Sequence, residues 1–164
     1  MRLFDSLTLS VISFSVGIIL LLIYSLYDVR NRSVPNMVSY VGIVLVMGLV
    51  LVDGQLLSEI ELHVTAILFS LVLSYVLYRM GAVGGADVKA LVALAIVSPG
   101  AAFVVWENPF LEAVINMGIV TGLMLLFGFL YWRLAIDSDN WNTKPPLIPF
   151  LLLSFIIIQC IFLV

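Results

Sequence analysis

The sequence predicts an all-α fold: a polytopic membrane protein built as a six-transmembrane-helix bundle, with both termini outside the cell. Hydrophobic residues make up 63% of the 164 residues and charged residues 10%, and the mean hydropathy is +1.24. A water-soluble domain needs more charge on its surface. Long uncharged segments recur along the chain, and a helix needs about 20 apolar residues to cross a bilayer. Because lipid offers the backbone no hydrogen bonds, we interpret these segments as helices.

The expected helices cover, in chain order, residues 7–27, 37–52, 60–78, 87–105, 110–132 and 147–164. Pro99-Gly100 interrupts the fourth segment, so we expect that helix to kink or end there. The first segment is too long for the apolar core of a signal peptide and lacks a small-residue cleavage site, so we expect it to remain as a membrane span. Residues 1–164 are expected to form a single membrane-embedded domain.

The basic residues set the expected orientation in the membrane. Six of the seven lie beside the first, third and fifth connections: Arg30, Arg32, Arg79, Lys89, Arg133 and Lys144. Lys and Arg accumulate in cytoplasmic loops, so we place these connections in the cytoplasm and the chain in the cell membrane as a multi-pass protein. Aromatic residues at the cytoplasmic helix ends are expected to form an interfacial belt: Tyr24, Tyr27, Tyr75, Tyr78, Tyr131 and Trp132.

The short inventory of reactive side chains excludes several classes of function. The net charge of −3 is spread thinly, so we expect no nucleic-acid partner. His63 is the single histidine and Cys160 the single cysteine, so we expect no metal cluster, no internal disulfide and no cofactor. We interpret His63 as part of an interfacial pair with Glu59 on the helix surface, and Cys160 as a small apolar packing residue.

Carboxylates are the reactive groups that remain on the cytoplasmic side. Asp137 and Asp139 belong to a polar loop and are expected to be solvated there. Asp28 ends the first expected helix and Asp87 opens the fourth, so the topology places both at one membrane level. An ionisable group in this position is a candidate functional residue. The structural alternative is that Asp87 caps its helix and Asp28 marks a helix end.

The residues around the two acids favour a function. The stretch "RMGAVGGADVKAL" places Gly81, Gly84 and Gly85 shortly before Asp87, which is more backbone freedom than a helix cap needs. Such glycines allow another backbone to approach closely. Downstream of Asp28, Pro35 favours an extended residue before it and a clean start for the next helix.

These residues carry a resemblance to a known family. Asp28 followed by Val34-Pro35-Asn36 resembles the D-x5-[IV]-P-N signature of the prepilin and preflagellin (prearchaellin) peptidase family, and the stretch from Gly84 to Lys89 resembles its G-x-G-D-x-K motif. The resemblance implies a GxGD-type intramembrane aspartic endopeptidase with Asp28 and Asp87 as catalytic residues. It implies that four further motif residues, with Gly84, shape the site: Pro35, Asn36, Gly85 and Lys89.

The resemblance also implies a substrate. Such an enzyme removes the short basic leader of type IV prepilins or of preflagellins at the cytoplasmic face of the membrane. Its partners are therefore these precursor proteins and membrane lipid. Ala86 stands where the bacterial motif usually has its second glycine, as in archaeal members. The four-cysteine insertion of the large bacterial enzymes is absent, so we expect proteolysis without N-methylation.

A mechanism follows if the two acids meet. Two neighbouring carboxylates share one proton over a wide pH range, so one acts as a base on a water molecule while the other acts as an acid toward the scissile carbonyl. The sequence leaves open which aspartate takes which part. It also leaves open whether Lys89 tunes the pair or extends to the interface. Asp137 and Asp139 are expected to attract the basic leader.

Two other classes of function stay open at this point. An ion- or proton-coupled carrier also places paired acids inside a helical bundle, usually at the midplane, and a membrane assembly scaffold would not need either acid. Gly118 and Gly122 have a spacing that favours close packing between helices. This spacing does not decide whether the chain forms a homo-oligomer.

Overall fold

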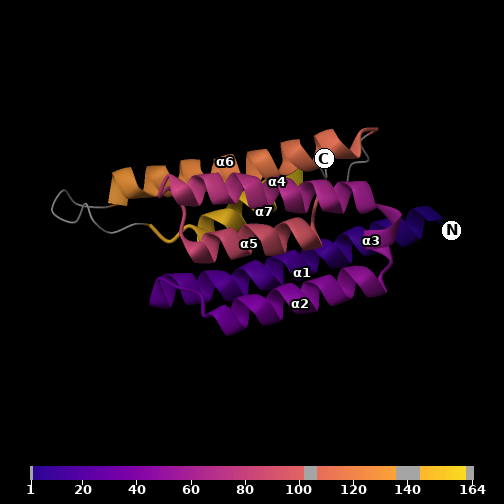
Figure 1. Ribbon diagram of the computed structural model, residues 1–164, viewed down its shortest axis with the longest axis horizontal. Helices are drawn as coiled ribbons and strands as arrows, with labels where there is room; N and C mark the ends of the chain where they lie inside the picture. Colours follow the sequence, from indigo (N-terminus) through magenta and orange to yellow (C-terminus); the bar gives the residue numbers. More distant parts are fainter. Residues whose placement is uncertain (1, 102–106, 136–144, 162–164) are drawn as a thin grey trace.

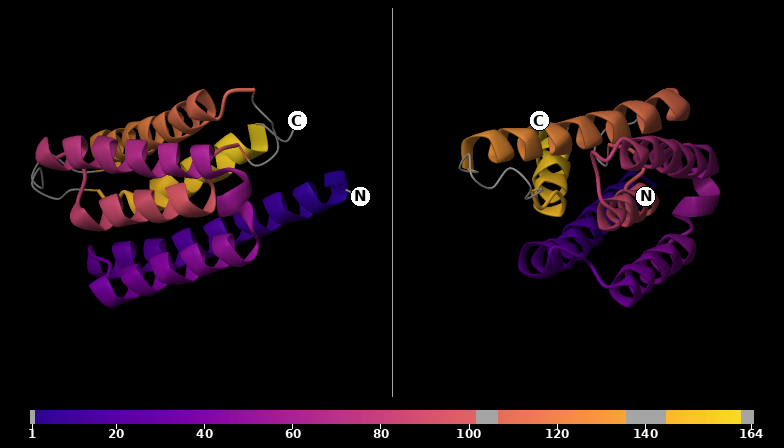
Figure 2. Two further views of the ribbon diagram at one scale, coloured as in Figure 1. Left: turned by 45° about the vertical axis from the view of Figure 1, so that its right-hand side comes forward. Right: turned by 60° about the vertical axis from the view of Figure 1, so that its left-hand side comes forward.

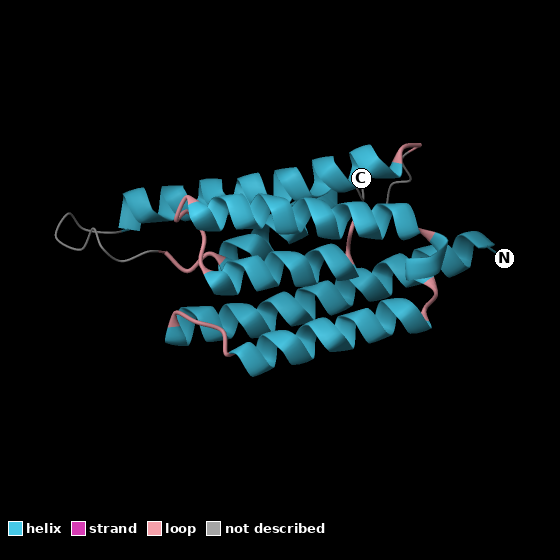
Figure 3. Cartoon of the chain, viewed as in Figure 1, coloured by secondary structure: helices cyan, strands magenta, loops and turns pink. Residues whose placement is uncertain are grey.

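The chain runs up and down through one helical bundle. The structure is a computed structural model that describes residues 2–101, 107–135 and 145–161, with side chains from residue 11 onward. Every regular element in this part of the chain is a helix (Figure 3). The elements are α1 (Arg2–Asn31), α2 (Asn36–Val52), α3 (Gln55–Ser58), α4 (Ile60–Arg79), α5 (Gly85–Val97), α6 (Pro109–Ala135) and α7 (Ile148–Ile161). The predicted all-α fold is confirmed for these residues.

The helices differ in their ability to cross a membrane. Three described segments are long and apolar enough to do so: Val11–Asn31 in α1, Ile60–Arg79 in α4 and Pro109–Leu134 in α6. The helices α2 and α7 are apolar but shorter. With 13 residues, α5 is about 20 Å long, which is less than the ~30 Å of the hydrocarbon layer. The chain is thus a helical membrane protein, and the count of six full spans stays a prediction.

The first helix extends further than expected. Its last residue is Asn31, so Asp28 lies inside the final turn instead of following the helix. Arg32 then adopts the left-handed conformation, with φ 54°, and its N–H donates to the carbonyl of Asp28 at 2.8 Å. This is the αL type of helix ending, which is usual for glycine and uncommon for arginine.

The helix α5 corresponds to the fourth expected span, and it begins and ends earlier than the expected 87–105. It starts at Gly85 with Gly84 as its N-cap, and it stops at Val97. Pro99 explains the stop, because proline disfavours helical backbone at the residue before it and lacks an N–H for the next turn. The short helix α3, between α2 and α4, was not predicted. The other long helices begin and end within three residues of the expected bounds over the described residues.

The helices alternate in direction, which brings distant segments to the same end of the bundle. At one end, on the left of Figure 1, α1, α4 and α6 finish while α2, α5 and α7 begin. We call it the acid end, because Asp28 and Asp87 lie on the last turn of α1 and the first turn of α5. At the opposite end α1 begins and α7 finishes. Central in the bundle, α5 packs against α1, α2, α4 and α7 (Figures 1 and 2).

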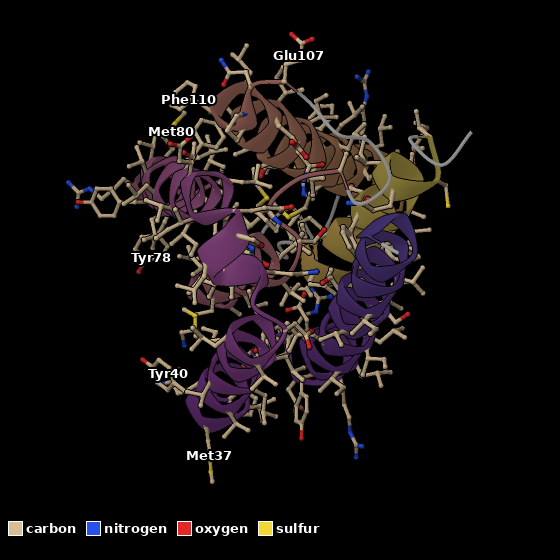
Figure 4. The ribbon with its side chains drawn as sticks, turned by 90° about the vertical axis from the view of Figure 1, so that its right-hand side faces the viewer. Met37, Tyr40, Tyr78, Met80, Glu107 and Phe110 are labelled. Atoms are coloured by element: carbon tan, nitrogen blue, oxygen red, sulfur yellow. The ribbon has the colours of Figure 1, made fainter. Side chains whose placement is uncertain are left out.

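The outer surface is apolar, as expected of a protein in lipid. Large side chains point away from the bundle in Figure 4: Met37, Tyr40, Tyr78, Met80 and Phe110. They are 53–78% exposed. Such a surface is stable in hydrocarbon and unusually large for a monomeric water-soluble protein.

Two sequence expectations about packing are wrong. Tyr24 is only 1% exposed, so it belongs to the core and not to the interfacial belt. Its hydroxyl donates to the carbonyl of Ser39 at 2.9 Å, which joins α1 to α2. Gly118 and Gly122 do not lie at a close helix contact within the chain, since a Cβ at Gly122 would meet nothing within 4 Å and one at Gly118 would reach a single atom of Phe69 at 4.0 Å.

Candidate active site at the acid end

Asp28 is held against the start of the last helix. Its side chain is 6% exposed, and Oδ2 accepts a hydrogen bond of 3.2 Å from the backbone N–H of Ile148, the first residue of α7. The first N–H groups of a helix have no partner within that helix. Asp28 therefore supplies α7 with a cap from another helix, and the positive end of the α7 dipole favours the charged carboxylate.

Asp87 is held by its own turn. It is 7% exposed, and its Oδ2 accepts a hydrogen bond of 2.7 Å from the N–H of Gly84. Asp87 is the third residue of α5, so it is not the N-cap that the structural alternative proposed. It satisfies the backbone N–H of the N-cap residue instead, which is the role of the acid in a capping box. Its carboxylate also lies at the positive end of a helix.

The glycines before Asp87 differ in whether their backbone conformation requires glycine. Gly81 has a φ of 74°, which favours glycine. Gly84 and Gly85 have negative φ and are exposed. A Cβ at Gly85 would meet nothing within 4 Å, and one at Gly84 would meet only Oδ2 of Asp87 at 3.3 Å. The backbone beside Asp87 is therefore uncovered by the described side chains, although it does not need unusual torsion angles.

Lys89 joins the two sequence motifs directly. Its Nζ donates a hydrogen bond to Oδ1 of Asn36 and lies 5.6 Å from the ring centre of Tyr40. A cation at this distance is attracted to the ring face. Asn36 is the first residue of α2, and Pro35 precedes it as the N-cap residue. Lys89 thus ties the first turns of α5 and α2 together, a contact that the sequence did not predict.

The two aspartates share one end of the bundle on helices that pack together, α1 and α5. Both are buried, and each carboxylate accepts a backbone N–H at the start of a helix. Asp137, Asp139 and Lys144 lie outside the described residues. The contact of Asp28 with the backbone of Ile148 was not predicted from the sequence. A signal for it exists in the proline-rich stretch before α7, which places a helix start at the level of Asp28.

The remaining reactive residues lie elsewhere. His63 is 1% exposed, so its interpretation as an interfacial surface residue is wrong. Cys160 is exposed near the end of α7, so it is not a packing residue within the bundle either. In the part of the chain that the structure describes, no three His, Cys, Asp or Glu side chains come together as a metal ion would require.

Fold and site together define a class: a helical membrane protein with two buried aspartates near one end of its bundle. A comparison with protein families matches residues 15–163 to the type IV leader peptidase family. The match covers nearly the whole chain, and the chain belongs to this family. Membership supports a leader peptidase activity, that is, a protease that acts on precursor proteins. No curated protein and no solved structure matches the chain.

Proposed function

We propose that the protein is an aspartic endopeptidase in which Asp28 and Asp87 are the catalytic residues. The observation that carries this proposal is the burial of both carboxylates on adjacent helices at one end of the bundle. Burying a carboxylate is costly unless other interactions compensate, and here each receives a backbone hydrogen bond. We also propose that residues 1–164 act as one membrane-embedded peptidase domain.

The proposed mechanism uses the two acids as a pair. One carboxylate, ionised, takes a proton from a water molecule, and the protonated partner donates toward the oxygen of the scissile carbonyl. The oxygen of the water bonds to the carbonyl carbon and gives a tetrahedral diol, with no covalent enzyme intermediate. The backbone N–H groups of Ile148 and Gly84 fix one oxygen of each carboxylate, so the acids keep their orientation during the reaction.

The proposed substrate is a prepilin or preflagellin whose apolar helix lies in the bilayer and whose short basic leader lies in the cytoplasm. Four basic residues with exposed side chains stand on the last turns of α1, α4 and α6 or directly after them, at the acid end: Arg30, Arg32, Arg79 and Arg133. Basic residues mark the cytoplasmic side, so we place the acid end there. The uncovered backbone of Gly84 and Gly85 offers an edge for an extended substrate.

The test is leader removal in cells that express the protein with a candidate prepilin, followed as a mobility shift on a gel. Asp28→Asn and Asp87→Asn each keep the shape of the side chain, and each is expected to lower the cleavage rate at least about a hundredfold, the contribution of a general acid or base. Asp53→Asn, at the opposite end of α2, is the matched control and should cleave normally.

Membrane insertion of every variant is checked by extraction and blotting. Cleavage at the normal rate by an inserted Asp28→Asn or Asp87→Asn variant would refute the proposal. Asp28-dependent proton uptake into vesicles without any cleavage would favour the carrier instead. A panel of prepilin and preflagellin leader peptides then identifies the substrate, and mass spectrometry of the new N-terminus tests the expected absence of N-methylation.

A further inference from the structure

A buried, non-helical segment follows α5 near the opposite end of the bundle, the end that faces the viewer in Figure 4. The segment is Ser98–Ala101, and all four residues are buried. At 1.5 Å per helical residue, Ser98 lies about 16 Å from Asp87 along the axis of α5. Backbone of this kind at membrane depth occurs where it is enclosed by protein or lines a polar site. Moreover, the last carbonyl groups of a helix lack partners within the helix.

A carboxylate lies directly on this segment. Glu112 of α6 is 8% exposed, and its Oε1 accepts a hydrogen bond of 3.1 Å from the N–H of Ala101. A Cβ at Gly100 would fall 2.0 Å from the same oxygen. No side chain other than hydrogen fits at Gly100 while Glu112 stays in place. The glycine is therefore required for the carboxylate to reach the backbone.

The amide side chains of Gln159 and Asn116 also contact the segment Ser98–Ala101. Nε2 of Gln159, on α7, donates at 3.3 Å both to Oγ of Ser98 and to the carbonyl of Gly100. Nδ2 of Asn116, on α6, lies 3.5 Å from the carbonyl oxygen of Pro99. Both amides are at least 96% buried. Residues of two helices thus converge on the four-residue segment with their polar ends.

The site has a buried acceptor that lacks a donor. Within the described residues, Oδ1 of Asn116 has no hydrogen-bond partner, although the side chain is 4% exposed and its other end reaches Pro99. Nδ1 of His63, on α4, is a second buried polar atom without a partner in the described part of the chain, and its side chain is 1% exposed. Leaving a buried acceptor without a donor destabilises the folded protein. A bound cation or a hydrogen-bond donor would satisfy such an acceptor.

We propose that Ser98–Ala101, Glu112 and Asn116 form a binding site for a small monovalent cation such as Na⁺. The carbonyl of Pro99, Oδ1 of Asn116 and the carboxylate of Glu112 are the oxygen ligands. The negative end of the α5 dipole adds to their attraction. In membrane proteins, interrupted helices with unwound carbonyls bind Na⁺ in this way.

The chemistry of the site favours a monovalent ion over a divalent one. Ca²⁺ takes six to eight oxygen ligands and usually several carboxylates. Among the described side chains with a hydrogen bond to the segment, Glu112 is the single carboxylate. The site is separate from the acid end, and it requires no peptidase activity for its test.

The test is thermal unfolding of the purified protein in detergent, with NaCl titrated against choline chloride at constant ionic strength. The expected result is a saturable rise in Tm of about 2–4 °C, as ligand binding to the folded state produces in a chain of this size. Asn116→Leu and Glu112→Gln are each expected to raise the half-saturating NaCl concentration at least tenfold. Thr121→Val is the matched control on α6, because its buried hydroxyl bonds within its own helix.

Direct binding of radioactive sodium ion to the wild-type protein, displaced by unlabelled NaCl, keeps the proposal testable if the variants do not fold. Equal Tm in NaCl and choline chloride would overturn it, and so would an unchanged response in Asn116→Leu. If acid pH raised Tm by the same amount and NaCl then had no further effect, a proton and not a metal cation would occupy the site. A stronger response to CaCl₂ at micromolar concentration would overturn the assignment to a monovalent ion.

Discussion

The carboxylate of Asp28 caps the backbone N–H of Ile148 at 3.2 Å, and this contact joins the first helix to the last. The two residues are 120 positions apart. An exposed cap of this kind is worth about 1 kcal/mol, and a buried hydrogen bond to a charged group about 1.5–3 kcal/mol. The placement of α7 and the orientation of a proposed catalytic carboxylate therefore depend on the same bond.

Removal of that N–H is the sharpest test of this dependence. Ile148→Pro deletes the donor, and proline fits the first position of a helix. We expect the rate of leader removal to fall about tenfold or more, since the lost bond is to a charged group. Ile148→Val keeps the N–H and trims the buried side chain, so it is the matched control. Initial rates on a purified precursor in detergent measure the effect, and equal rates for the two variants would contradict it.

The contact between Lys89 and Asn36 predicts a second series. Asn36→Leu removes the acceptor and should lower the cleavage rate about three- to tenfold, as expected for one hydrogen bond of 0.5–1.5 kcal/mol. Asn36→Asp offers Lys89 an oxygen with a charge and is expected to retain activity. Met37→Leu, at an exposed neighbouring position, serves as the control. Loss of activity in Asn36→Asp equal to that in Asn36→Leu would show that the contact does not hold the site.

Sequence patterns were sufficient where a long apolar run is bounded by polar residues. The expected bounds of α2 and α4 differ from the observed ones by one residue. Sequence patterns failed where a single backbone angle decides the end of a helix. The end of α1 at Arg32 is such a case, because arginine gives no indication of a left-handed conformation. The start of α5 was misplaced because both Gly84 and Asp87 are acceptable capping residues, and the choice depends on tertiary surroundings.

The candidate site shows the same division. The motifs around Asp28 and Asp87 could be identified along the sequence, and alternating helices place both near one end. The bond from Ile148 and the contact of Lys89 with Asn36 join residues 120 and 53 positions apart, so no local pattern predicts them. The burial of His63 also escaped prediction, because the packing of α4 against α5 and α6, and no local pattern, decides which face of α4 is enclosed.

Substitution by alanine is expected to have different effects on the free energy of unfolding at Ser70 and at Ser74. Both are buried on α4, but Oγ of Ser70 has no partner within the described residues, whereas Oγ of Ser74 donates to the carbonyl of Leu71 at 3.2 Å. Ser70→Ala removes an unsatisfied group and should leave the free energy of unfolding unchanged or raise it by about 1 kcal/mol. Ser74→Ala should lower it by roughly 0.5–1 kcal/mol. Denaturant titration in mixed micelles distinguishes them, and a clear loss in Ser70→Ala would mean that its hydroxyl has a partner.

The packing of α1 against α2 depends on Gly42 of α2. Gly48, on the same helix, is the control position. A Cβ at Gly42 would fall 2.2 Å from the hydroxyl oxygen of Tyr24 and 2.8 Å from Cδ1 of Leu20, whereas one at Gly48 would meet nothing within 4 Å. Gly42→Ala therefore forces the helices apart and should cost about 1–3 kcal/mol, the usual effect of overpacking. Gly48→Ala should stabilise α2 by up to about 1 kcal/mol, because alanine favours a helix. Thermal unfolding in detergent measures both. Adding Tyr24→Phe to Gly42→Ala removes the nearest atom and is expected to restore part of the loss; if it restores none, the hydroxyl is not what the new methyl group meets.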